Sequence, residues 1–380
     1  MVEFAFSEEQ ELFRQAVREF AQQGLAPGYL ERARSDAPPL DVIDKLRDQG
    51  LLALNLPEEY GGQGADHVTL GIAVEEIARA DINAIFCNAL VGPLMKYGTP
   101  EQRQRWLSPM ATGDCFLGLA LTEPHCGSDA AAIRTNAVRD GDEYIINGEK
   151  SSISMTTWAH AFFLFAKTDP QAGARGVSCF LVPRDSSGLT LSQFHDMGSK
   201  PLGRGALNLK DVRIPAENRV GEEGMGFKMV MGEFDYIRVL IGLQCLGAAQ
   251  VSLEEAGDYA KDRTAFGKPI ARFEGISFLI AEHATLMEAA RLLCYKVLWM
   301  RDQGLPHTKE AAMVKWWVPQ LTAKAIQDAL LIHGHLGYSD EFPLEQRLRD
   351  VLGYQLADGT AQIQKIVIAR ELIGREFLPY

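Results

Sequence analysis

The spacing of apolar residues divides the chain into three segments. In the first, apolar side chains recur every three or four positions, which predicts helices over 40–53, 68–80 and 99–111. A further helix is expected to begin at Ser7, because Ser7 and Gln10 have the spacing of a capping box. We therefore expect residues 1–114 to form a helical domain.

The hydrophobic period shortens in the second segment, between residues 115 and 222. Short apolar runs such as Ala161–Lys167 and Val177–Val182 are bounded by Gly, Asp, Asn or Pro, which is typical of strands. Asp140 followed by Gly141 predicts a hairpin turn. This segment is expected to be a β domain.

Long helical patterns return in the third segment, residues 223–380. They predict helices over 226–262, 273–304, 307–334 and 361–375, with a kink at Pro319. The predicted fold class is α+β, in which a helical domain is followed by a β-sandwich or barrel domain and a C-terminal four-helix bundle.

The composition of the chain argues against some classes of function. Acidic residues outnumber basic ones by 50 to 38, giving a net charge of −12, and no Lys/Arg run is present, so we expect no nucleic-acid partner. No run of about 18 uninterrupted apolar residues occurs, so no membrane span is expected. The first ten residues are acidic from Glu3 onward and do not resemble a targeting peptide, which predicts a cytoplasmic protein.

Cysteine and histidine spacing predicts no metal site. No CxxC pair or HExxH motif is present, and His333 and His335 lack a further ligand nearby in the sequence. Scattered cysteines without a pairing pattern are expected to be reduced thiols; they are Cys87, Cys115, Cys126, Cys179, Cys245 and Cys294.

Six strings carry a resemblance to a known family. In chain order they are Pro57–Gly62, Leu121–Asp129, Asn147–Lys150, Lys210–Pro215, Arg263–Lys268 and Asp358–Gln364. In this order and spacing the chain resembles the acyl-CoA dehydrogenases. The resemblance implies FAD as cofactor, an acyl-CoA substrate, a homotetramer, and an electron-transfer flavoprotein as electron acceptor. It also implies that a carboxylate takes the α-proton while the β-hydride passes to flavin N5.

Asp358 is the candidate base. The family's usual base is a glutamate immediately before Gly-Thr, and Asp358 stands at that place. Some relatives carry the glutamate on an earlier helix, where this chain has Ile237. From the residues alone, Asp-Gly-Thr before an apolar run also predicts a helix cap, and both roles remain open.

The shorter side chain bears on the substrate. Aspartate withdraws the carboxylate by about 1.5 Å relative to glutamate, and Ala357 stands where many relatives have tyrosine. The extra room favours an α-branched or alicyclic acyl group such as cyclohexane-1-carbonyl-CoA, and aspartate here resembles the cyclohexanecarbonyl-CoA dehydrogenase branch. A 1,2-dehydrogenation is preferred over a 1,4-reaction because Asn88 offers no second acid.

Two alternatives remain open. A nitroalkane-oxidase-type flavin oxidase shares the fold and uses an aspartate base. A non-catalytic flavin- or acyl-binding protein is motivated by departures from the family pattern: Asp358 in place of glutamate, Ser152 in place of tryptophan, and Glu274 and Leu331 in place of glutamine. His335 also replaces a common glycine. A carrier-protein thioester could also replace the CoA thioester.

The resemblance assigns the remaining candidate residues by position. Arg263 and Phe266 would reach the FAD of a neighbouring subunit, while Thr360 and Gln362 would lie near its adenine–ribose part. The other expected flavin contacts are Leu119, Leu121, Thr122, Gly127, Ser128, Ser152 and Ser154. The expected substrate contacts are Ser128, Phe234, Asp235, Arg238 and Gly359.

Overall fold

The computed structural model describes residues 5–84 and 91–378, and its N-terminal domain is helical as predicted. The capping box is confirmed, because the Gln10 N–H donates to the Ser7 hydroxyl at 3.1 Å and the Ser7 N–H donates to the Gln10 side chain at 3.2 Å. One predicted helix ends at Asp48, five residues early, because Gly50 adopts a φ of +68°. The helices are α1 (Glu8–Phe20), α2 (Tyr29–Arg34), α3 (Leu40–Asp48), α4 (His67–Ala80), α5 (Gly92–Tyr97) and α6 (Pro100–Thr112).

The middle segment forms an eight-stranded sheet, which confirms the predicted β domain. Its strand order is β6-β7-β3-β2-β4-β5-β8, and β1 pairs in parallel with β4. Gly141, with a φ of +64°, makes the predicted turn between β2 and β3. The strands are β1 (Leu117–Ala120), β2 (Asn136–Asp140), β3 (Glu143–Ile153), β4 (Ala161–Lys167), β5 (Val177–Pro183), β6 (Leu189–Gln193), β7 (Gly205–Pro215) and β8 (Arg219–Val220).

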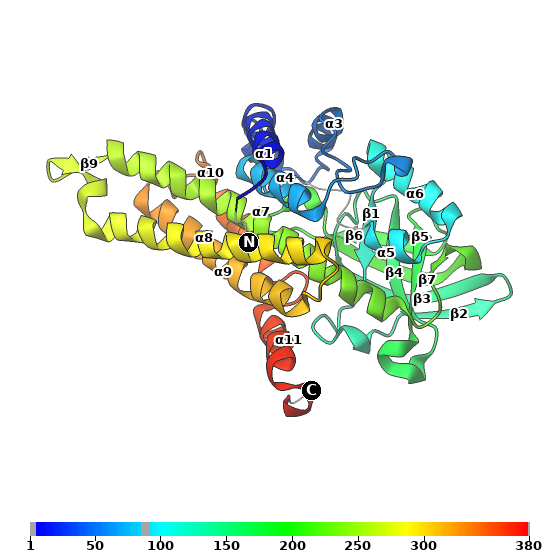
Figure 1. Cartoon of the computed structure of the whole chain (residues 1–380). Helices are drawn as coiled ribbons and strands as arrows, with labels where there is room; N and C mark the ends of the chain where they lie inside the picture. The colour runs from blue at the N-terminus through cyan, green and yellow to red at the C-terminus, as the bar shows by residue number, and fades with distance from the viewer. Residues whose placement is uncertain (1–4, 85–90, 379–380) are drawn as a thin grey trace.

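The third segment is a bundle of long helices that extends away from the sheet (Figure 1). Pro319 lies inside α9, and the helix continues through it. One helix, α10, was not predicted from the sequence. The elements are α7 (Gly226–Asp262), β9 (Thr264–Ala265), β10 (Lys268–Pro269), α8 (Glu274–Asp302), α9 (Thr308–Ile332), α10 (Pro343–Tyr354) and α11 (Ala361–Ile373).

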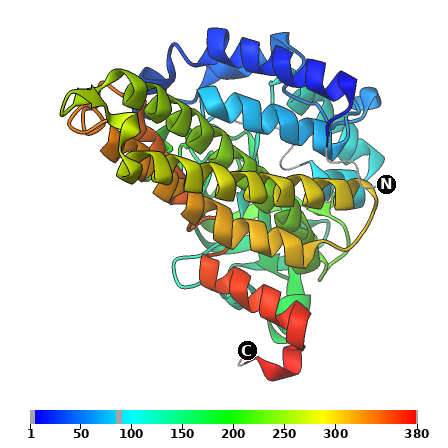
Figure 2. The ribbon, with the colours of Figure 1, turned by 60° about the vertical axis from the view of Figure 1, so that its left-hand side comes forward.

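Helix α7 is the central element of the bundle. It is long and apolar enough to cross a membrane by length and composition, which the count of uninterrupted apolar residues did not reveal. However, 78% of its most apolar window is buried within the fold, against α9 and α4 among others. Figure 2 shows the N-terminal helices, in blue, lying over this part of the bundle. Its apolar character is therefore accounted for by core packing.

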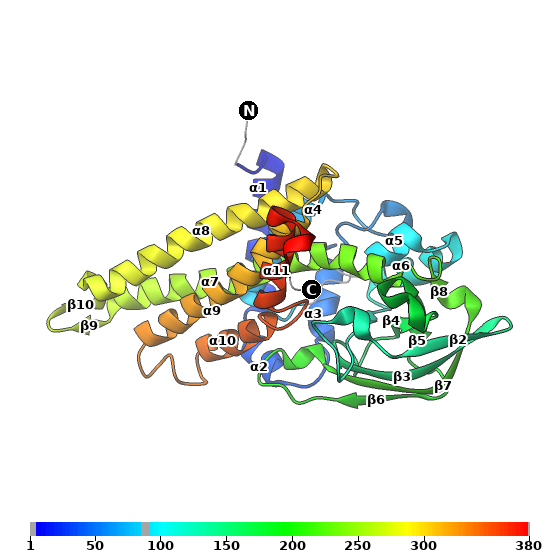
Figure 3. The ribbon, with the colours of Figure 1, turned by 90° about the horizontal axis from the view of Figure 1, so that it is seen from below.

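The three domains meet at the carboxylate of Asp350 on α10. It accepts hydrogen bonds from the Tyr29 hydroxyl (2.8 Å), the Asn83 amide (2.9 Å) and the Ser199 N–H (2.7 Å). A fourth bond comes from Gln346, one turn earlier on α10, at 2.9 Å. Figure 3 shows α2 beside α10 at this joint. A fully buried carboxylate thus ties the N-terminal domain and the β domain to the bundle.

Candidate active site

The loop between α10 and α11, called the base loop below, carries Asp358 in an unusual backbone conformation. Asp358 has a φ of +51° and Gly359 a φ of +95°. A non-glycine residue rarely adopts a positive φ, so surrounding contacts must hold Asp358 there. Helix α11 has Thr360 as its N-cap, so the interpretation of Asp358 as a helix cap is wrong.

Three side chains hold the backbone carbonyls of this loop. The Arg238 Nε atom and the Gln364 amide each donate to the Asp358 carbonyl at 3.2 Å. The Lys315 Nζ atom donates to the carbonyls of Tyr354 (2.8 Å) and Gly359 (3.2 Å). Because these donors come from α7, α11 and α9, three helices fix the loop from different directions.

Gly359 is required by this arrangement. The Gln364 amide also donates to the Gly359 carbonyl at 3.2 Å. A Cβ atom on residue 359 would lie 2.5 Å from the Gln364 Nε2 atom, in addition to the strain of a positive φ. Glycine therefore allows Gln364 to approach the loop closely enough to hold it.

The Asp358 carboxylate itself accepts no hydrogen bond from the residues that the structure describes. Burial raises the pKa of this carboxyl above its ordinary value, although the positive charges of Lys315 and Arg238 act in the opposite direction. A carboxylate without hydrogen-bonded partners, on a rigid backbone and with a raised pKa, is well suited to accept a proton.

Three of the predicted substrate residues, all on α7, form a group beside this loop. Arg238 is buried, and its guanidinium donates to the Asp235 carboxylate at 3.0 Å as well as to the Asp358 carbonyl. The Thr308 hydroxyl, which the sequence did not point to, donates to the other Asp235 oxygen at 2.6 Å. The Arg238 guanidinium lies over the Phe234 ring, with 5.6 Å between its Cζ atom and the ring centroid. The structure thus gives Arg238 a contact with the base loop that was not expected.

A second loop, which follows β1 and is called the flavin loop below, carries several of the predicted flavin contacts. Leu119 lies within β1 and is half-buried, Leu121 is buried, and Gly127 and Ser128 are exposed. Within the described parts of the chain, the N–H groups of Thr122, Gly127 and Ser128 donate to no acceptor. Backbone donors of this kind suit the carbonyl oxygens and ring nitrogens of a flavin, so the loop fits FAD.

The end of β3 adds two serines to this region. Ser154 is half-buried, and its hydroxyl has no partner among the described residues. Ser152 has a φ of +63°, and its hydroxyl accepts a hydrogen bond from Arg204. Arg204 is in turn paired with Asp196 and was not identified from the sequence. Its only sequence signal is a charged residue between Gly203 and Gly205.

Arg263 and Phe266 lie far from both loops. They belong to the hairpin region of β9 and β10, at the end of the bundle opposite the sheet (Figure 1). Phe266 is 95% exposed. By contrast, Thr360 and Gln362 begin α11, directly after the base loop. The single chain therefore does not bring Arg263 and Phe266 together with the other predicted flavin residues.

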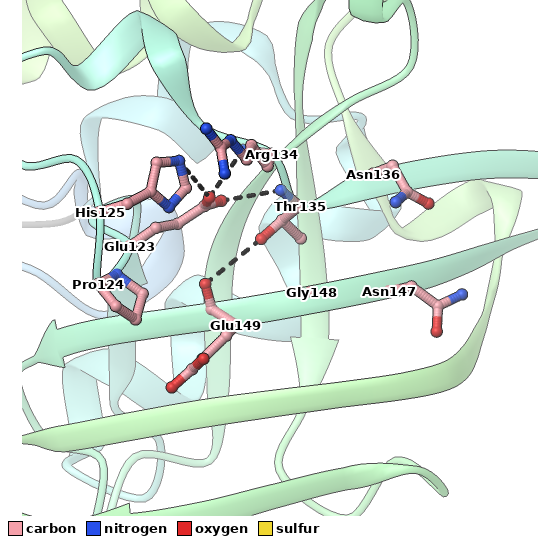
Figure 4. Close-up of a pocket in the computed structure, with 9 residues that line it drawn as sticks. All are labelled: Glu123, Pro124, His125, Arg134, Thr135, Asn136, Asn147, Gly148 and Glu149. Atoms are coloured by element: carbon pink, nitrogen blue, oxygen red, sulfur yellow. Dashed lines mark hydrogen bonds and ion pairs between the residues drawn. The ribbon is translucent and has the colours of Figure 1, made fainter.

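Glu123, His125 and Cys126 form a cluster that could hold a metal ion, since their ligand atoms lie within 4.8 Å of one another. Figure 4 shows Glu123 and His125 in the adjoining pocket. The Glu123 carboxylate already accepts bonds from Lys150 Nζ (2.8 Å) and from the N–H groups of Arg134 (2.7 Å) and Thr135 (3.0 Å). We therefore interpret Glu123 as holding the flavin loop against β3.

The described cysteines are free thiols, and all of them are buried. Burial raises the pKa of the Cys115 thiol to about 11, so it stays protonated at neutral pH. Cys87 and Asn88, both considered in the sequence analysis, lie outside the described residues.

Comparison with known proteins decides the family. Profiles described as the N-terminal, middle and C-terminal domains of acyl-CoA dehydrogenase match residues 7–114, 118–212 and 224–373. The chain belongs to the acyl-CoA dehydrogenase family. It is therefore an oxidoreductase, and the flavin loop is expected to hold FAD.

Several similar proteins align with nearly the whole chain. The mouse mitochondrial short-chain specific acyl-CoA dehydrogenase is 38% identical over 96% of this chain and 90% of its own length. Subunit CarC of the caffeyl-CoA reductase–Etf complex of Acetobacterium woodii is 37% identical over 97% of this chain and 100% of its own length. The butyryl-CoA dehydrogenase structure from Megasphaera elsdenii matches with a TM-score of 0.93 and 32% identity, covering 98% and 100% of the two chains.

Proposed function

We propose that this acyl-CoA dehydrogenase oxidises an α-branched or alicyclic acyl-CoA, such as cyclohexane-1-carbonyl-CoA, with Asp358 taking the α-proton. The observation that carries the proposal is the Asp358 carboxylate, which accepts no hydrogen bond from the described residues while its backbone is held by three side chains. Its raised pKa suits a group that must hold a proton after accepting it.

The same loop offers a donor for the thioester oxygen. Among the described residues, the N–H of Asp358 donates to no acceptor. A donor fixed beside the base can stabilise the negative charge that develops on the thioester oxygen as the α-proton leaves. FAD, when bound, would accept the hydride from the β-carbon. Asp358 would thus orient the substrate through its backbone and deprotonate it through its side chain.

Two small side chains support the proposed preference for a bulky substituent on the α-carbon. Asp358 is one methylene shorter than the glutamate of typical relatives, which withdraws the carboxylate by about 1.5 Å. Ala357 adds little volume beside it, and the structure leaves Ala357 exposed. A ring or branch at the α-carbon would occupy this room and bring the α-hydrogen back within reach.

We also propose a homotetramer and an electron-transfer flavoprotein as acceptor. The position of Arg263 and Phe266 at the far end of the bundle supports an FAD site completed by a second copy. Exposed apolar side chains on α8 and α11 support the same assembly; they include Phe278, Trp299, Leu372 and Ile373. The acceptor is supported by the name of the Acetobacterium relative, a subunit of a complex with Etf.

Anaerobic titration of the purified holoenzyme tests the substrate proposal. Cyclohexanecarbonyl-CoA and butyryl-CoA would be added separately while the visible flavin absorbance is followed. Bleaching by the ring thioester, and little by butyryl-CoA, is the expected result. Bleaching by butyryl-CoA alone would refute the ring preference, and oxygen uptake with nitroalkanes without thioester oxidation would point to an oxidase.

A further inference from the structure

Lys315 is a buried lysine without a directly bonded carboxylate. It is 1% exposed within α9, and its ammonium donates to the carbonyls of Tyr354 and Gly359. The other fully buried lysine among the described residues, Lys150, pairs with Glu123 at 2.8 Å. Burying an ammonium without an ion pair is costly, so the arrangement at Lys315 requires an explanation.

The protonation state of Lys315 is set by its surroundings. Burial lowers its pKa to about 8, while the negative charge of Asp358 acts to raise it. At neutral pH most molecules therefore carry the ammonium ion. Its positive charge also acts on Asp358 and opposes the effect of burial on that carboxyl.

The other titratable groups around the pair do not supply this charge balance. On α7, burial raises the pKa of the Cys245 thiol to about 12, and Arg238 is paired with Asp235. On α10, burial raises the pKa of the Tyr354 hydroxyl far above neutrality. On α11, Arg370 acts on Arg238. Of these groups, Asp358 supplies the largest negative charge that acts on Lys315.

We propose that Lys315 is a positioning residue for the base: it fixes the carbonyls on both sides of Asp358 and supplies the positive charge that balances its deprotonated form. The inference rests on the proposed role of Asp358. In the reaction the α-carbon–hydrogen bond breaks, its electron pair stays with the substrate, and the proton moves to the Asp358 carboxylate. Lys315 keeps its own proton throughout, so no bond to Lys315 forms or breaks.

The test compares Lys315→Met with Lys324→Met in the FAD-loaded enzyme. Lys324 lies on the same helix with its side chain 58% exposed and pairs with Asp328, so its loss removes one lysine charge away from the base loop. The limiting rate of flavin reduction by the ring thioester would be measured by anaerobic stopped flow from pH 5.5 to 9, together with thioester affinity.

For Lys315→Met we expect the limiting rate to fall about 100-fold, because the loop loses two anchors. We also expect the pH at half-maximal rate to rise by about one unit, since a carboxylate ionises less readily without the nearby cation. Thioester affinity should change by less than about threefold, because Lys315 bonds to the loop backbone and not to the acyl group. Lys324→Met should retain the wild-type rate and pH midpoint.

A folded Lys315→Met enzyme with a wild-type pH midpoint would overturn the inference. If Lys315→Met does not retain FAD, Lys315→Arg carries the test, since it keeps the charge while displacing the donor atoms. Its rate should fall with the pH midpoint unchanged, and a raised midpoint would overturn the inference.

The Asp358→Asn variant separates this inference from the proposed function on which it rests. If Asp358→Asn reduces flavin as fast as wild type, Asp358 is not the base. A failed Lys315 test with inactive Asp358→Asn would refute the positioning role alone.

Discussion

Two carboxyl groups, eight residues apart, are held in opposite ways: Asp350 is fully buried and Asp358 is half-buried. Asp350 on α10 accepts four hydrogen bonds through its side chain. Asp358 accepts none through its side chain from the described residues, while its backbone carbonyl accepts two. Burial raises the pKa of both carboxyls. Because the pKa of both groups is raised, the pKa does not distinguish Asp350 from Asp358. The two groups differ in which of their atoms accept hydrogen bonds.

The difference indicates two roles. At Asp350 all four donors bond to the side-chain carboxylate, which connects the three domains. These bonds occupy its oxygen atoms, so the carboxylate is not available to accept a proton from a substrate. At Asp358 the donors hold the backbone, so the side chain is positioned without being neutralised by direct bonds. A group that must exchange a proton needs the second arrangement, because strong hydrogen bonds to the charged form would weaken it as a base.

The largest effect should come from removing the Asp358 carboxylate. Asp358→Asn should slow flavin reduction by the ring thioester by at least about 1,000-fold, because an amide cannot accept the α-proton. Asp358→Glu is the matched control, since it restores a carboxylate that reaches about 1.5 Å farther. It should retain activity and shift the preference toward butyryl-CoA. Stopped-flow reduction with both thioesters measures these changes.

The next effect should come from Gly359, which lets Gln364 hold the loop. Gly359→Ala should reduce the limiting rate about 100-fold, because the added Cβ displaces the Gln364 amide and the positive φ becomes strained. Gly353→Ala is the control, because a Cβ at that helical position meets nothing within 4 Å. It should leave the rate unchanged and stabilise the helix slightly. Equal effects of the two substitutions would contradict this view of the loop.

Asp350 should affect stability more than chemistry. Asp350→Ala would leave the buried Tyr29 hydroxyl, Asn83 amide and Ser199 N–H without their acceptor. We expect a loss of about 3 kcal/mol in the free energy of unfolding, measured by denaturant titration. The folded fraction should still reduce its flavin within about tenfold of the wild-type rate. Wild-type stability in this variant would contradict a structural role.

Glu233, another buried carboxyl, provides a smaller test that depends on pH. Burial raises its pKa from 4.5 to about 7, and its Oε1 atom has no partner among the described residues. The stabilising contribution of the protonated form is complete below pH 4.5 and is lost as the pH rises through 7. Glu233→Gln does not titrate, so relative to wild type its free energy of unfolding should gain about 2 kcal/mol on moving from pH 5.5 to pH 8. A pH-independent difference in thermal unfolding would contradict the raised pKa.

The sequence predicted the elements with strong periodicity. Residues 226–262 coincide with α7, because a long apolar pattern ends where Arg263 begins a hairpin. Helix α10 was not predicted, because its twelve residues lie between loops and include five charged or amide side chains. Short amphipathic helices of this kind depend on tertiary packing more than on local pattern.

The site was predictable only in part. Asp358, Gly359 and Gln364 lie in one recognisable string. The bonds that Gln364 and Lys315 donate could not be predicted, because their acceptors are backbone carbonyls, which leave no complementary residue type in the sequence. One signal for Lys315 was present. It shares a helix face with Ala311, Val318 and Thr322, all buried, so a lone charge on an apolar stripe marked the position.

The central claim is that Asp358 removes the α-proton, and a kinetic isotope effect tests it most directly. Cyclohexanecarbonyl-CoA deuterated at the α-carbon would be mixed anaerobically with wild-type enzyme and with Asp358→Asn. We predict that wild-type flavin reduction slows several-fold with the deuterated thioester and that Asp358→Asn reduces with neither. Reduction of Asp358→Asn at the wild-type rate with the same isotope effect would show that another group is the base.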